Sequence, residues 1–187
     1  MIIMKNKIYN YIDNLKKVLD SFDVDALEKI IRLFISARDN KKTIYVFGNG
    51  GSGSTASHMV CDIIKGCSYE KEKKFKIICL NDNIPTILAY SNDVSYDIVF
   101  EEQLKNLMSK DDVVLAISGS GNSKNIVRAV DYANTNGATT IGFSGFNGGL
   151  LKKKAKVNLH VPIDDMQISE DFHVIAMHIM YTILSDS

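Results

Sequence analysis

The hydrophobic positions of the first forty residues recur at the spacing of amphipathic helices. In the first segment, six apolar residues fall on one stripe: Ile8, Tyr11, Ile12, Leu15, Leu19 and Phe22. After Asp23, an expected N-cap, the same spacing continues through Leu27, Ile30, Ile31 and Phe34. The pattern predicts two helices that form an N-terminal helical appendage over residues 1–40.

From residue 43 onward, the pattern changes to short apolar runs rich in β-branched residues. Five such runs lie at residues 43–48, 75–80, 112–118, 138–144 and 157–162, and segments long enough for helices separate them. A last helical pattern runs from Phe172 to Leu184. Strand and helix alternation of this kind predicts an α/β fold, a parallel sheet with helices on both faces. No boundary divides the chain, so residues 1–187 are expected to form a single domain.

Composition narrows the classes of protein that the chain can represent. Its 187 residues are 45% hydrophobic and 24% charged, values typical of one folded domain. Lys and Arg (22) balance Asp and Glu (22), so we expect neither nucleic acid nor an anionic membrane as a partner. No signal peptide or membrane span is evident, and the three cysteines lack metal-binding spacing. These features predict a soluble cytoplasmic protein.

A glycine-rich loop, residues 48–55, follows the first predicted strand. Its glycines let the backbone turn sharply and direct N–H groups at an anion where a helix begins. The loop also satisfies G-x-G-x-x-G, and Asp82 could then contact the ribose of NAD, but the chain has little room for a separate substrate domain. We therefore expect no nucleotide cofactor. A Walker A site is excluded because no Gly-Lys-Ser/Thr follows.

A second polar loop, residues 118–123, follows the third strand and leads into a predicted helix over residues 124–133. Its serines and glycines offer hydroxyl and backbone donors to an anion without any basic side chain. The ends of neighbouring parallel strands are where ligands bind in open α/β sheets. The two loops together predict a site for a phosphorylated small molecule.

Candidate acid–base residues occur on two predicted helices. His58 and Asp62 stand at positions i and i+4, so both side chains can converge on one atom. Glu170 and His178 stand eight residues apart near the C-terminus. A lone histidine on a helix is more often structural than catalytic, and we interpret His160 and His173 in this way.

The chain resembles the SIS (sugar isomerase) family through five motifs in the family's order: GNGGSGSTASHMVCDIIKG, NDNIPTILAYSND, ISGSGNSKNIVRAV, GFSGFNGG and EDFHVIAMH. They are most similar to the phosphoheptose isomerase branch, which converts sedoheptulose 7-phosphate to D-glycero-D-manno-heptose 7-phosphate. The resemblance implies a three-layer α/β/α sandwich with a five-stranded parallel sheet. It also implies a homotetramer with active sites at subunit interfaces.

The resemblance assigns roles to individual positions. It implies Asp62 and His178 as the catalytic acid–base pair, and a zinc ion held by His58, Asp62, Glu170 and His178. The substrate contacts that it implies are Asn49, Gly50, Gly51, Ser52, Asp62, Asn92, Asp93, Ser118, Gly119, Ser120, Ser123 and Glu170. Asp62 replaces the family's Glu, Glu170 its Gln and Gly119 its Thr. The carboxylate of Glu170 favours a cation beside it and opposes an enediolate.

Two other functions fit the same family. One is a non-catalytic SIS-domain protein that binds the bacterial replication initiator, and the other is a regulator that senses a sugar phosphate. A pure binding protein has no need of His58, Asp62 and His178 together, and no helix-turn-helix segment accompanies the domain. The sequence therefore favours the isomerase.

Overall fold

The computed structural model describes residues 2–187 and contains, within them, a five-stranded parallel sheet in the order β2-β1-β3-β4-β5. Its strands are β1 (Thr43–Gly48), β2 (Lys76–Cys79), β3 (Val113–Ser118), β4 (Thr139–Ser144) and β5 (Val157–His160). Each of the five predicted apolar runs contains one of these strands. The α/β fold class and its five parallel strands are therefore confirmed.

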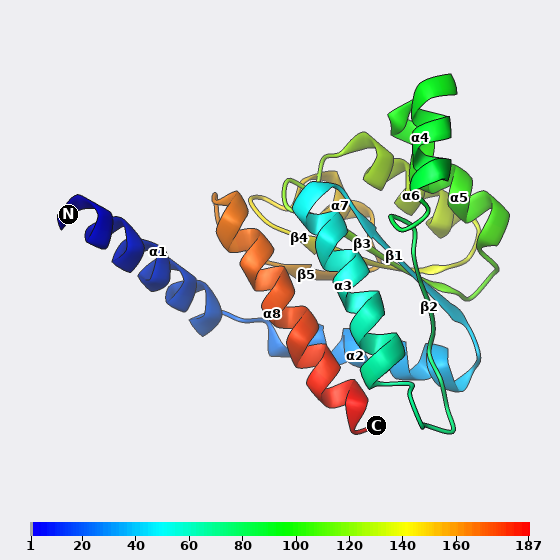
Figure 1. The fold of residues 1–187 in the computed structure, drawn as a ribbon, viewed down its shortest axis with the longest axis horizontal. Helices are drawn as coiled ribbons and strands as arrows, with labels where there is room; N and C mark the ends of the chain where they lie inside the picture. Colours follow the sequence, from blue (N-terminus) through cyan, green and yellow to red (C-terminus); the bar gives the residue numbers. More distant parts are fainter. Residues whose placement is uncertain (1) are drawn as a thin grey trace.

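Helices precede the sheet and connect its strands (Figure 1). They are α1 (Ile2–Asp20), α2 (Val24–Asp39), α3 (Gly50–Gly66), α4 (Ile84–Asp93), the 3₁₀ turn η1 (Tyr96–Ile98), α5 (Val99–Leu107), α6 (Lys124–Thr135), α7 (Gly149–Lys154) and α8 (Met166–Ser185). The predicted N-cap of α2 is present, because the Asp23 side chain accepts a hydrogen bond of 2.9 Å from the amide of Ala26.

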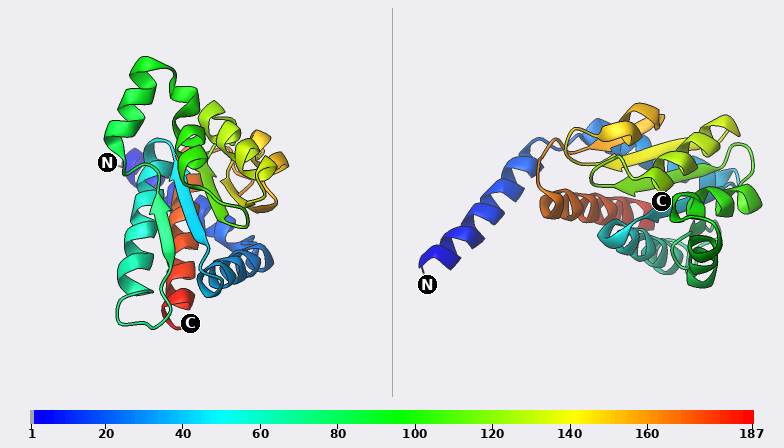
Figure 2. Two further views of the ribbon diagram at one scale, coloured as in Figure 1. Left: turned by 90° about the vertical axis from the view of Figure 1, so that its right-hand side faces the viewer. Right: turned by 90° about the horizontal axis from the view of Figure 1, so that it is seen from above.

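Two apolar cores cover the two faces of the sheet, as alternating strand residues require. On one face, Val46, Leu115 and their neighbours pack with α2, α3 and α8. On the other face, Phe47 and Val114 pack with α5, α6 and α7, and the rings of Phe47 and Phe100 stack 4.8 Å apart. The molecule is thus the expected three-layer sandwich, and Figure 2 shows it from two further sides.

The two N-terminal helices behave differently. Helix α2 lies on the sheet, and its Ile30 and Phe34 are fully buried. Helix α1 leaves the body of the molecule and extends into solvent (Figures 1 and 2). Only its C-terminal part packs on α8, where Tyr11 donates a hydrogen bond of 2.7 Å to Asp171. Farther out, Met4 and Tyr9 are 70% and 63% exposed.

Candidate functional site

The two polar loops meet at the point where the strand order reverses. Strands β1 and β3 are neighbours, although β2 follows β1 in the chain, so their carboxyl ends open a crevice between them. A cavity of about 250 Å³ lies there. Its lining residues are Asn49, Gly50, Gly51, Ser52, Ser118, Gly119, Ser120, Ser123, Met166 and Glu170. All eight predicted contacts from the two loops therefore share one cavity.

Backbone geometry shapes the first loop for close approach. Gly50 has a φ of 53°, a left-handed conformation that side chains with a Cβ disfavour, and it opens α3. Asn81, just after β2, accepts a hydrogen bond from the Gly48 amide at 3.1 Å and donates one to its carbonyl at 2.7 Å. The amides that follow at the start of α3 have no partner within the helix and can bind an anion.

The second loop is held in a similar way. Gly121 has a φ of 66°, and a Cβ there would collide with the Gly148 carbonyl. The hydroxyl of Ser118 accepts a hydrogen bond of 3.2 Å from the Gly121 amide, so this serine shapes the loop. Ser123 precedes α6 without using its side chain as a cap, which leaves its hydroxyl available to a ligand.

Three of the four predicted metal ligands come together on α3 and α8. One donor atom each from His58, Asp62 and His178 lies within 4.8 Å of the others. The Asp62 Oδ2 atom is 3.3 Å from His58 Nε2 and 3.9 Å from His178 Nε2. The two imidazoles are about half exposed, and their rings meet edge to face at 5.2 Å. Two imidazoles and a carboxylate form a ligand set that suits zinc.

The fourth predicted ligand, Glu170, lies elsewhere. Its two carboxylate oxygens are each 2.5 Å from the position that a Cβ on Gly51 would occupy, so Glu170 borders the cavity between the two loops, the candidate anion cavity. It precedes His178 by eight residues, which places it about 12 Å away along the axis of α8. This distance separates the two side chains. Within the described part of the chain, the cluster therefore has three members, His58, Asp62 and His178, and not the four that were expected.

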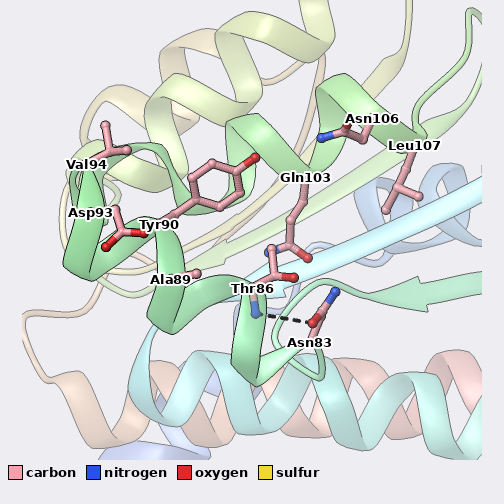
Figure 3. Close-up of a pocket in the computed structure, with 9 residues that line it drawn as sticks. All are labelled: Asn83, Thr86, Ala89, Tyr90, Asp93, Val94, Gln103, Asn106 and Leu107. Carbon is pink, nitrogen blue, oxygen red and sulfur yellow. Dashed lines mark hydrogen bonds between the residues drawn. The ribbon is translucent and has the colours of Figure 1, made fainter.

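The predicted sugar contacts Asn92 and Asp93 are also apart from the anion cavity. They end helix α4, are exposed, and bond to each other at 2.7 Å. Asp93 helps to line a different cavity, of about 460 Å³, between α4 and α5, together with Tyr90 and Gln103 (Figure 3). This chain therefore does not bring the pair to its own anion cavity.

The histidines interpreted as structural are buried to different degrees. His160 ends β5, and its Nδ1 lies 3.1 Å from the Ser144 hydroxyl. His173 is fully buried against Phe143 and Phe172, and neither of its ring nitrogens has a hydrogen-bond partner among the described residues. Its burial lowers the pKa of His173 to about 4. His173 is thus a core residue, but one without the partner that a core histidine usually has.

Two asparagines near the loops escaped prediction. Asn81 braces Gly48, as described above, and the buried Asn125 pairs with Asn49. Asn81 follows β2 by two residues and holds backbone in place, whereas Asn125 is in the first turn of α6 and holds a second amide. Asn81 opens the motif NDNIPTILAYSND and Asn125 lies within ISGSGNSKNIVRAV, but the motif letters alone do not distinguish them from surface asparagines.

Comparison with known proteins gives a consistent result. A family model described as SIS domain matches residues 10–145. A probable phosphoheptose isomerase from Thermoplasma acidophilum is 37% identical over 163 residues, which is 86% of this chain and 89% of that protein. A phosphoheptose isomerase from Helicobacter pylori is 34% identical over 89% of this chain and 85% of its own. The solved structure of a phosphoheptose isomerase from Francisella tularensis has a TM-score of 0.89 at 26% identity, covering 98% and 99% of the two chains.

The chain belongs to the SIS domain family. Within that family it is similar to the phosphoheptose isomerases, over most of its length and in its fold. The resemblance stated from the motifs is therefore confirmed. None of the helices in the described part of the chain is long and apolar enough to cross a membrane.

Proposed function

We propose that this protein is a sugar-phosphate isomerase that interconverts sedoheptulose 7-phosphate and D-glycero-D-manno-heptose 7-phosphate. The observation that carries the proposal is the approach of His58 and His178 to one oxygen of Asp62, on the two helices that border the anion cavity. The names of the relatives identify the substrate class. Loops rich in serine and glycine suit its phosphate.

The chemistry requires a base and an acid. Moving the carbonyl between C1 and C2 removes a proton from one carbon, passes through an enediol, and returns a proton to the other carbon. Asp62 is the candidate base, since it supplies the carboxylate of the cluster. His178 is the candidate acid, because a protonated imidazole can supply a proton to the sugar oxygen as negative charge develops there.

The spacing along the helices favours a long sugar. Helices α3 and α8 lie side by side and run in the same direction, so Gly51 faces Glu170 and, farther along, Asp62 faces His178 (Figure 1). His58 is seven residues beyond Gly51, about 10 Å along α3. A seven-carbon chain whose phosphate is bound in the loops can span that separation. A triose phosphate cannot.

We also propose zinc as the metal of this site, held by His58, Asp62 and His178. The ligand atoms lie within 4.8 Å of one another, so small rotations of these partly exposed side chains would bring them to the Zn–N and Zn–O distances of about 2.0–2.2 Å. When bound, zinc would polarise the sugar carbonyl as a Lewis acid in place of proton donation by His178, because a metal-bound imidazole is neutral. Three protein ligands leave a coordination position open to the substrate, as in other catalytic zinc sites.

A homotetramer with its active sites at subunit interfaces completes the proposal. The outer part of α1 presents Met4, Ile8, Tyr9 and Ile12 to solvent, and contiguous apolar surface of this kind marks contact sites. The half-exposed imidazoles would gain shelter from water beneath a second copy. Light scattering should report a mass close to four chains.

Because all three cysteines are free thiols, we place the protein in the cytoplasm.

The direct test is turnover. Purified protein is incubated with sedoheptulose 7-phosphate, with and without added zinc, and the aldose product is followed by ¹³C NMR. Appearance of the aldose supports the proposal, with dihydroxyacetone phosphate as the short-chain control that should not react. Binding of sugar phosphates without any turnover would contradict it and favour a sensing or adaptor role.

A further inference from the structure

The side chains of Asn49 and Asn125 form a reciprocal amide pair between the two anion loops. Asn49 Nδ2 donates to Asn125 Oδ1 at 2.9 Å, and Asn125 Nδ2 donates to Asn49 Oδ1, also at 2.9 Å. Asn49 directly follows β1, at the N-cap position of α3, whereas Asn125 is in the first turn of α6, directly after the second loop. The pair is therefore a direct polar link between the two walls of the cavity.

A third residue completes the arrangement. The hydroxyl of Tyr96, in η1, donates to Asn49 Oδ1 at 2.7 Å. An amide oxygen has two lone pairs, so Asn49 Oδ1 is fully used by Tyr96 and Asn125. One N–H of Asn49 is all that remains for a ligand. The side chain of Asn49 is therefore occupied mainly with holding protein, although it lines the cavity.

Asn125 itself is committed to this role. It is 2% exposed, and its Oδ1 also accepts a hydrogen bond of 3.0 Å from the amide of Ile126. It does not line the anion cavity, so it cannot touch a ligand bound there. The segment that carries Tyr96 is attached to the same helix, because the Lys124 ammonium group lies 3.6 Å from the Asp97 carboxylate.

We propose that Asn125 and Tyr96 are positioning residues that act through Asn49 to hold the glycine-rich loop at a fixed distance from the serine loop, so that both can contact one anion. The anion is the phosphate group of the substrate, and in this respect the inference rests on the proposed function. A phosphate bound by donors from two separate loops needs those loops at the correct distance from each other. A displacement near 1 Å of a group that contacts the substrate has a large effect on the reaction rate. Buried amides leave little freedom for such a displacement.

The test is a double-mutant cycle on phosphate affinity in the full-length protein, with inorganic phosphate as the probe and calorimetry as the measurement. The variants are Asn49→Ala, Asn125→Leu, which keeps the buried volume, and their combination. We expect each single variant to raise the Kd for phosphate by roughly tenfold or more, because each leaves an amide partner unpaired. We expect the double variant to be no weaker than the weaker single one, because Asn125 acts through Asn49.

Two further variants separate positioning from general damage to the fold. Tyr96→Phe removes one hydrogen bond at an exposed site without disturbing the core, and should raise the Kd several-fold. Asn136→Ala, at the other end of α6, also removes an asparagine hydrogen bond, to the Tyr132 carbonyl. It should leave phosphate affinity unchanged even if it lowers the melting temperature.

Fully additive losses in the cycle, unchanged affinity in Asn125→Leu and Tyr96→Phe, or absence of phosphate binding in the wild type would each overturn the inference. Turnover of sedoheptulose 7-phosphate is measured separately. A wild-type protein that binds phosphate, shows the coupling and yet does not isomerise the sugar would refute the proposed function and leave the positioning role supported.

Discussion

The Oδ2 atom of Asp62 on α3 lies 3.9 Å from Nε2 of His178 on α8, so the candidate base and acid come from two helices that are far apart in the sequence. The contact exists because α3 and α8 pack against the same face of the sheet. His58 Nε2 lies 3.3 Å from the same oxygen, and its ring meets that of His178 edge to face. A carboxylate flanked by two imidazoles can exchange protons with a bound sugar or hold a cation.

Removing either member of the acid–base pair should abolish most of the turnover. Asp62→Asn and His178→Ala are each expected to lower kcat by about 10²–10⁴-fold, the usual contribution of a positioned acid or base. Thr182→Ala, one turn beyond His178 on α8, is the control, since its hydroxyl donates a hydrogen bond to the His178 carbonyl of its own helix. Retention of wild-type kcat in both variants would show that the chemistry takes place elsewhere.

Zinc affinity should depend on three residues and not on the fourth. His58→Ala and His178→Ala are expected to weaken zinc binding, measured by calorimetry on chelator-treated protein, by tenfold or more. Glu170→Gln should leave zinc affinity unchanged, because Glu170 lies beside Gly51 and outside the cluster. If Glu170→Gln weakens zinc binding as much as His178→Ala does, the ion has four ligands and the side chain of Glu170 must move to reach it.

Glu170→Gln should instead improve substrate binding. The carboxylate borders the cavity that we propose for the substrate's phosphate, and two negative charges at close range repel each other. Replacing it with the neutral amide is expected to lower KM by a few-fold, more at low ionic strength than at high. Asp186→Asn makes the same change of charge at the far end of α8 and should leave KM unchanged. An increase in KM for Glu170→Gln would mean that the carboxylate accepts a hydrogen bond from the sugar.

The serine loop should determine phosphate affinity. Ser123→Ala removes a hydroxyl that has no capping role, and the loss of a hydrogen bond to a charged group is worth about 1.5–3 kcal/mol. KM is expected to rise by ten- to a hundredfold with little change in kcat, and Ser120→Ala should behave similarly. Ser185→Ala, at the end of α8, serves as the control. Wild-type KM in both loop variants would place the phosphate outside this loop.

Much of the fold follows from local pattern. Runs of β-branched residues predicted all five strands, and Asp23 predicted the start of α2, because a buried parallel strand and an N-cap each need particular residues at adjacent positions. The contrast between α1 and α2 did not follow. Both carry an apolar stripe, but only the packing of α2 on the sheet buries its stripe, as at Ile30.

The site was predictable where it depends on one loop or one helix turn. The two polar loops and the pair His58–Asp62 are each defined by neighbouring residues. In the structure the loops line one cavity, and His58 lies beside Asp62, as the sequence predicts. Asn125 and the location of Glu170 depend on which segments face each other in three dimensions. The eight-residue spacing along α8 places Glu170 and His178 far apart along the helix axis. Only the contact with Gly51 in the folded protein shows what Glu170 faces.

Acid should destabilise the protein through His173. The folded protein lowers the pKa of this histidine to about 4, because burial disfavours the charged imidazole, whereas the unfolded chain returns it to about 6.5. Above pH 6.5 the imidazole is neutral in both the folded and the unfolded chain. As pH falls from 6.5 toward 4, the unfolded chain binds a proton that the folded protein does not, so the free energy of unfolding decreases progressively. The full loss is roughly 3 kcal/mol. His160 adds to it in the same direction, since burial also lowers its pKa.

The variant His173→Leu tests this directly. It replaces an imidazole whose two nitrogens have no hydrogen-bond partner in the described chain with an apolar side chain, so the cost of burying unpaired polar atoms disappears. Urea unfolding between pH 4 and pH 7 should show a shallower loss of stability in the variant than in the wild type. Phe34→Leu, a fully buried change in the same core, should lower stability by a similar amount at every pH. An equal pH dependence in His173→Leu and the wild type would show that protonation of His173 does not contribute to acid unfolding.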